Sequence, residues 1–107
     1  MNKAVISTYD IKYEKQAEFQ ALIKKFLRFK KANPKAFEGV KSFELFQQEF
    51  GGLVGSYHEM WEFKSKEAMD KIVAGLMKNK EWMKIDAEFL KLVDHTTLTQ
   101  SIWNNVA

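Results

Sequence analysis

The chain of 107 residues contains no cysteine, and this absence excludes several kinds of site at once. Without thiols there is no disulfide framework, no thiolate metal site and no cysteine nucleophile. No apolar run is long enough to cross a bilayer, since a spanning helix needs about twenty predominantly apolar residues. The first residues also lack the apolar core of a signal peptide, so we expect a cytoplasmic protein without a membrane partner.

The glycine and histidine patterns of several catalytic classes are missing as well. Gly51 and Gly52 lie in neither a phosphate-binding loop nor a serine nucleophile elbow. The two histidines, His58 and His95, have no third ligand at a diagnostic spacing. We therefore expect no metal site and no bound cofactor.

Charge is plentiful but mixed in sign. Seventeen lysine and arginine residues alternate with fourteen aspartate and glutamate residues, which is typical of solvated helix faces. The densest basic cluster, between Lys24 and Lys35, spreads around one predicted helix and forms no single stripe. We therefore expect no nucleic-acid partner.

The apolar content is sufficient for one packed domain over residues 1–107. Apolar residues make up 46% of the chain and aromatic residues 14%, and a domain of about 100–150 residues usually has a single core. Nine phenylalanines, three tryptophans and three tyrosines are a heavy load for one core of this size. Some of these rings could cover a second surface, which favours an oligomer.

Hydrophobic periodicity predicts the element order β-α-β-β-α-β. Period-two alternation predicts strands over 4–12, 40–50, 53–63 and 96–103, and apolar residues three and four apart predict helices over 14–33, 65–79 and 81–93. Pro34 ends the first helix, Ser65 is the predicted N-cap of the second, and Asn79 splits that helical region in two. This is the order of a ferredoxin-like α+β fold, with a four-stranded antiparallel sheet and helices on one face.

Residues 57–63 are the most informative segment, because aromatic and titratable side chains alternate there along one predicted strand. Alternation separates two sets on opposite faces: Tyr57, Glu59, Trp61 and Phe63, against His58, Met60 and Glu62. Helices cover only one face of such a sheet. We therefore expect the aromatic set to lie on the uncovered face, where it must meet a partner, a ligand or both.

The stretch 59–68 (Glu-Met-Trp-Glu-Phe-Lys-Ser-Lys-Glu-Ala) resembles the central block of the dimeric α/β-barrel superfamily. Residues 79–82 (Asn-Lys-Glu-Trp) and 89–93 (Phe-Leu-Lys-Leu-Val) are similar to NIPSNAP-type members, and antibiotic-biosynthesis-monooxygenase-like members share the first block. The resemblance implies a homodimer in which two ferredoxin-like units join their open sheets into a barrel. A pocket is then expected within the barrel or between each sheet and its helices.

The resemblance also implies a range of activities. Members include cofactor-independent monooxygenases, heme-degrading enzymes, isomerases and dehydratases, so fold alone assigns no chemistry. Trp61 matches the pocket tryptophan of monooxygenase-type members, and Tyr57 stands where some place a polar pocket residue. Heme-degrading members use a first-strand asparagine, where Thr8 or a neighbour stands here, and a helix histidine that residues 65–93 lack. Heme degradation is therefore not expected.

Three residues are candidate catalytic groups. Glu59, between Tyr57 and Trp61, could act as a general acid or base, or form a salt bridge to a lysine such as Lys12. Tyr57 shares its face. His58 becomes the proton shuttle if the face assignment is inverted.

Four residues are candidate substrate-binding groups. Trp61 and Phe63 would form an apolar wall for a flat ligand, or else fill a subunit interface. Thr8 and Asp10 would add polar contacts from the first strand in the same cavity.

These features favour a small homodimeric enzyme that acts on a small organic molecule by cofactor-independent oxygenation or proton transfer. A non-catalytic ligand-binding or structural homodimer is the alternative. RNA binding on the strand aromatics is disfavoured, because the consensus of that motif is missing and Glu59 and Glu62 would repel phosphates.

Overall fold

The computed structural model describes residues 1–52 and 54–107, and it confirms the predicted order of elements. The strands described are β1 (Lys3–Ile11), β2 (Val40–Gln47), β3 (Tyr57–Phe63) and β4 (Val93–Asn104). The α-helices described are α1 (Gln16–Ala32), α2 (Lys66–Leu76) and α3 (Lys80–Leu92), with 3-10 turns η1 (Tyr13–Lys15) and η2 (Pro34–Phe37). The strands form one antiparallel sheet in the order β2-β3-β1-β4.

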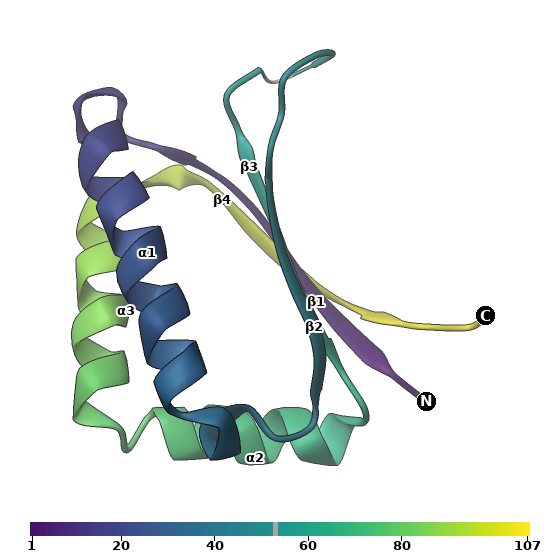
Figure 1. Ribbon diagram of the computed structural model, residues 1–107. Helices are drawn as coiled ribbons and strands as arrows, with labels where there is room; N and C mark the ends of the chain where they lie inside the picture. The colour runs from purple at the N-terminus through teal and green to yellow at the C-terminus, as the bar shows by residue number, and fades with distance from the viewer. Residues whose placement is uncertain (53) are drawn as a thin grey trace.

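The helices and the sheet form two layers. In Figure 1, α1 and α3 run side by side along one face of the sheet, and α2 crosses its lower end. The opposite face carries no helix from the part of the chain that the structure describes. None of the helices in that part has the length and apolarity needed to cross a membrane.

Local side-chain caps explain where α2 and α3 begin. The Ser65 hydroxyl accepts a hydrogen bond from the Ala68 amide at 3.1 Å, which confirms the predicted N-cap of α2. Asn79 caps α3 in the same way, with its side-chain oxygen 3.0 Å from the Trp82 amide. The predicted split of the second helical region therefore arises because Asn79 starts a new helix.

Three strand ends differ from the prediction by more than one residue. β2 ends at Gln47 and β3 begins at Tyr57, so the segment between them is longer than the predicted hairpin. Gly51 and Gly55 have positive φ angles of 89° and 94°, a conformation that glycine adopts readily and that breaks the extended backbone. Leu53, the predicted start of the third strand, lies outside the described residues. β4 begins at once after α3, at Val93.

The core lies between the sheet and the helices and is largely aromatic. Phe19 of α1 packs edge-on against Tyr9 and Tyr57, with ring centroids 6.1 and 4.7 Å apart. Tyr57 and Phe63 are only 3% and 5% exposed. The expectation that the aromatic set of the third strand lies on the uncovered face was therefore wrong. These rings face the helices because burial there removes the most apolar surface from water.

The open face of the sheet carries both half-buried and exposed apolar side chains. Ile6 and Met60 are opposite each other on neighbouring strands and are half-buried. Phe46 and Trp103 are 53% and 57% exposed. This face therefore keeps apolar surface in contact with solvent.

Candidate functional site

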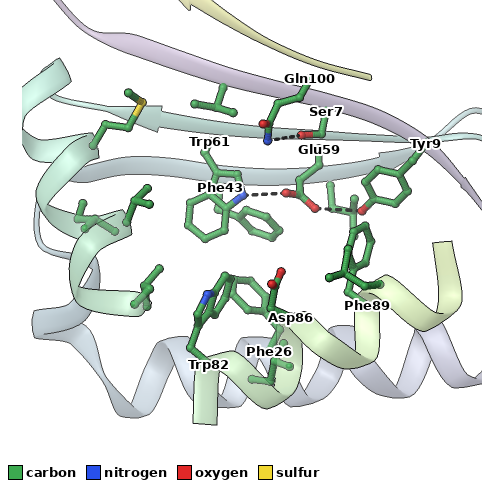
Figure 2. Close-up of a pocket in the computed structure, with 18 of the residues that line it drawn as sticks. Ser7, Tyr9, Phe26, Phe43, Glu59, Trp61, Trp82, Asp86, Phe89 and Gln100 are labelled. Atoms are coloured by element: carbon green, nitrogen blue, oxygen red, sulfur yellow. Dashed lines mark hydrogen bonds between the residues drawn. The ribbon is translucent and has the colours of Figure 1, made fainter. Parts of the chain in front are cut away.

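A cavity of about 730 Å³ lies between the sheet and the helices. Val5, Phe43 and Trp61 form its sheet wall, and Trp82 and Phe89 of α3 face them. Figure 2 shows these rings around a hollow into which the Glu59 side chain points. The volume lies within the roughly 300–1,000 Å³ that is usual for small-molecule sites.

The mouth of the cavity lies beside the edge strand β4. The lining residues there are partly exposed apolar groups, namely Leu98 and Ile102 on β4, Val73 on α2 and Leu90 on α3. A ligand can thus enter between β4 and the helices. The inner end is closed by buried rings such as Phe19.

A polar row crosses the sheet wall of this apolar cavity. The strand register pairs Glu59 with Ser7 and pairs Ser7 with Gln100, and paired residues point to the same side of a sheet. The Gln100 side-chain amide donates to the Ser7 hydroxyl at 3.3 Å. Three polar side chains from three strands therefore meet the ligand space in one line (Figure 2).

Glu59 is held by two donors of different kinds. The Tyr9 hydroxyl donates to one carboxylate oxygen at 3.0 Å, and the Trp61 indole nitrogen donates to the other at 2.9 Å. Within residues 1–52 and 54–107, Glu59 forms no ion pair, so the salt-bridge reading with Lys12 was wrong. A carboxylate has about four acceptor positions, so these bonds leave room for a bond to a ligand.

Tyr9 is a strong structural donor to this carboxylate. Burial raises the pKa of the Tyr9 phenol far above its usual range, and the nearby Glu59 charge and hydrogen bond raise it further. The phenol therefore stays protonated and keeps donating to Glu59. Its ring is 2% exposed and packs against Phe89 at 5.0 Å.

Trp61 and Phe63 line the cavity, on the same face of β3 as Glu59. Trp61 lies 4.6 Å from the Phe43 ring and stacks on Phe37 at 5.9 Å. These contacts fix the indole, so its N–H is already aimed at Glu59. Phe63 stacks behind Trp61 at 6.2 Å.

Tyr57 shares that face but does not line the cavity. Its hydroxyl donates to Gln16 and accepts from Gln20, both at 3.3 Å. Its ring lines a separate hollow of about 390 Å³ between α1 and β2. The structure thus gives Tyr57 a packing position beside the site.

Thr8, Asp10 and His58 lie on the open face of the sheet. Thr8 Oγ1 is 3.5 Å from His58 Nδ1, and Asp10 accepts a hydrogen bond from Ser56. The expectation that Thr8 and Asp10 share a cavity with Glu59 was wrong, because they alternate with the inward-facing residues of β1. His58 is exposed and is separated from Glu59 by the sheet.

The sequence analysis missed five polar residues that line the cavity, namely Ser7, Tyr9, Asp70, Asp86 and Gln100. Ser7 and Tyr9 could have been found by alternation along the first strand, once its pairing with Glu59 was assumed. Asp86 follows Trp82 by four residues and precedes Phe89 by three, so helical spacing placed it on their face. Gln100 required the register of β4, which no local pattern supplies.

No group of three or more residues able to ligate a metal lies within the described part of the chain. The polar groups of the site are carboxylates, the buried Tyr9 phenol, the Ser7 hydroxyl and the Gln100 amide, within largely aromatic walls.

Comparisons with solved structures show that the chain has a known fold. A NIPSNAP family protein from Agrobacterium tumefaciens superposes with a TM-score of 0.76 at 14% identity, over 99% of this chain and 94% of its own. The chain has the fold of NIPSNAP family proteins. A protein from Caulobacter crescentus, provisionally described as an antibiotic biosynthesis monooxygenase, gives a TM-score of 0.74 at 16% identity, over 99% and 91% of the two chains.

A third structure of this kind is a dimer. It is a protein of unknown function with a ferredoxin-like fold from Bacteroides fragilis, with a TM-score of 0.64 at 10% identity, over 97% and 96% of the two chains. No protein-family model and no curated protein matches this sequence. The predicted ferredoxin-like α+β fold is thereby confirmed, and identities this low carry the likeness no further than the fold.

Proposed function

We propose that this protein is a homodimeric enzyme that binds a small, largely apolar organic molecule in the cavity and transfers a proton through Glu59. The observation that carries the proposal is the Glu59 carboxylate, which projects into an aromatic cavity and is held by Tyr9 and Trp61 without an ion-pair partner among the described residues. A base fixed in this way removes a proton without first having to be oriented.

The proton-transfer reaction needs only the substrate and this base. Glu59 takes a proton from an activated carbon of the substrate, and the electron pair of the broken C–H bond stays behind as a delocalised carbanion or enolate. Return of the proton at another position completes a proton-transfer reaction. In the monooxygenase-like variant, dioxygen is the oxidant of a CH₂ group: one oxygen atom forms the new carbonyl and the other leaves as water.

The walls of the cavity would supply the remaining conditions. Trp61, Phe43 and Trp82 offer flat apolar surfaces that position an aromatic substrate and exclude water from Glu59. The Caulobacter protein has the same fold and is provisionally described as a monooxygenase, and this description alone supports the oxygenation variant. The geometry of Glu59 is the stronger support.

The homodimer part of the proposal rests on the open face of the sheet. Ile6 and Met60 form a half-buried centre there, and Phe46 and Trp103 leave ring surface exposed. A second copy of the chain would cover this surface. The Bacteroides protein, which shares the fold, is described as dimeric.

A carbon acid with a coloured product tests Glu59 directly. In 5-nitrobenzisoxazole, removal of the carbon-bound proton is accompanied by formation of the nitrile and cleavage of the N–O bond, which releases a yellow phenolate. We expect the wild-type protein to accelerate this elimination about a hundredfold over acetate at equal carboxylate concentration. Glu59→Gln should return the rate to background.

Glu62→Gln is the matched control, since Glu62 lies on the same strand but on the open face, where it accepts a hydrogen bond from Asn105. It should leave the rate unchanged. Equal rates for wild type and Glu59→Gln would contradict the assignment of Glu59 as the base.

A non-catalytic ligand-binding dimer is the second candidate. It is favoured by one observation, namely that both oxygens of Glu59 already accept hydrogen bonds from the protein. On this reading the benzisoxazole raises the thermal midpoint of the protein but is not turned over. A stable dimer in sedimentation with no response to any aromatic ligand would instead indicate a structural protein.

A further inference from the structure

The charged residues that line the cavity are all acidic. Glu59 comes from β3, Asp70 from α2 and Asp86 from α3, and no lysine or arginine is among the described lining residues. The chain as a whole has a net charge of +3 and seventeen basic residues. The cavity therefore has the opposite sign to the protein that surrounds it.

Two of the three carboxylates lack a positive partner. Asp70 forms an ion pair with Lys66 at 3.0 Å and is well exposed. Asp86 is half-buried and forms no ion pair within residues 1–52 and 54–107, which is also true of Glu59. In Figure 2 the Asp86 carboxylate projects from α3 into the cavity, toward the strand that carries Glu59.

The aromatic walls favour the same sign of ligand charge. Phe26 lies 5.6 Å from Trp61 and 5.9 Å from Trp82, and Phe43 lies 4.6 Å from Trp61. The faces of such rings carry negative potential and attract organic cations, most strongly for tryptophan. These rings line the same cavity as the carboxylates, and a ring face in contact with a ligand would likewise favour a cation.

We propose that the ligand of this cavity is a flat organic cation, with its ammonium group at Asp86 and its reacting atom at Glu59. This rests on the proposed function, because it assigns a ligand class to the same cavity. The division of roles follows from the geometry. Glu59 is tied to the sheet by two hydrogen bonds, whereas Asp86 has none from the described residues and is available for a charged group.

Three probes of similar shape and different charge test the inference on the wild-type protein. They are 2-(aminomethyl)naphthalene, a cation at neutral pH, neutral 2-ethylnaphthalene and anionic 2-naphthoate. Isothermal titration calorimetry at low salt should show the ammonium probe binding at least tenfold more tightly than the neutral probe. The carboxylate probe should bind more weakly than both. Added salt should reduce the preference for the ammonium probe.

Asp86→Asn keeps the shape of the side chain and removes its charge. We expect it to weaken binding of the ammonium probe about tenfold while the neutral probe is unaffected. Asp70→Asn is the matched control, since Asp70 is an aspartate at the same cavity that is already paired, and it should change the ammonium affinity less than twofold. The thermal midpoint of each variant verifies that it is folded.

The outcomes separate this inference from the proposed function. If the neutral probe binds as tightly as the ammonium probe, or if Asp86→Asn weakens both equally, the charge selection is wrong while a ligand cavity remains. If 2-naphthoate binds best, the sign is wrong. If none of the three probes binds, the cavity does not take a flat ligand, and both this inference and the proposed function are wrong.

Discussion

The two faces of β3 have different roles although their residues alternate along one strand. The face toward the helices carries Glu59 and Trp61 in a closed hydrogen-bonded set inside an apolar cavity. The face away from the helices carries His58, Met60 and Glu62, which are exposed or half-buried. Adjacent residues of β3 therefore point to different faces, one toward the candidate catalytic cavity and the other toward the candidate dimer interface.

The difference teaches that density of titratable groups is a poor guide to the site. Histidine is a common proton-transfer group near neutrality, and His58 is the histidine of this strand. It nevertheless lies in the open, with Thr8 Oγ1 at 3.5 Å. Glu59 is less conspicuous in the sequence, and yet its surroundings give it two fixed donors and an apolar cavity.

The largest difference between the two faces of the sheet should be in the free energy of unfolding that a substitution removes. Phe19→Ala removes a ring that packs on Tyr9 and Tyr57 and is 3% exposed, and we expect a loss of about 3–5 kcal/mol in the free energy of unfolding. Phe46→Ala, on the open face at 53% exposed, should cost less than about 1 kcal/mol. Urea denaturation at one protein concentration measures both. Equal losses would remove the distinction between the two faces.

The next contrast concerns assembly. Met60→Glu places a charge in the centre of the open face and should weaken the dimer at least tenfold, about 1.4 kcal/mol, because the new carboxylate must be desolvated. Met83→Glu introduces the same change on α3, where the side chain is 39% exposed, and should leave the dimer intact. Sedimentation equilibrium measures the two constants. A wild-type protein that sediments as a monomer would contradict the proposed dimer.

Alkaline pH tests the covered face. Burial raises the pKa of Tyr9 above its ordinary value of 10.0, so above that pH the unfolded chain binds fewer protons than the folded chain. The stabilisation is complete below pH 10 and declines as the pH rises, by up to about 1.4 kcal/mol per pH unit. Tyr9→Phe should flatten this decline. Tyr13→Phe, at a tyrosine 93% exposed, should not alter it.

Acid pH tests the open face and should have the smallest effect. Hydrogen bonds from the Thr96 hydroxyl and amide, 2.7 and 3.1 Å long, lower the pKa of Asp94 below 3.8. Its stabilising contribution is therefore present above that value and is lost as the pH falls through the lower pKa of the folded state. Thermal unfolding at a series of pH values from 6 down to 2 measures it.

The expected result is a shallower acid-side loss for Asp94→Asn than for the wild type. The difference should be small, because the carboxyl is solvent-accessible. Asp70→Asn, at another exposed carboxylate, serves as control. An identical acid profile for Asp94→Asn and wild type would show that the Thr96 contacts contribute nothing to stability.

The sequence by itself determined the order of elements and the positions where α2 and α3 begin. Both follow from short-range physics: apolar spacing defines the helices, Ser65 and Asn79 supply the capping oxygens, and Pro34 stops α1. It also separated Glu59 and Trp61 from His58, because alternation along a strand is a local property. The ends of β2 and β3 were less predictable, since the backbone between them depends on two glycines with positive φ.

Only the tertiary structure decided which face of the sheet is covered and which residues share the cavity. Alternation groups residues by face but does not tell which face the helices cover. Thr8 and Asp10 were therefore assigned to the wrong side of the sheet. Helical spacing groups Asp86 with Trp82 and Phe89, but only helix packing turns that face toward the ligand space. Gln100 reaches the same space through the register of β4. The strand sequence left two possibilities, since either face of β3 could be covered by the helices. The burial of Tyr57 and Phe63 against the helices determines which face is covered.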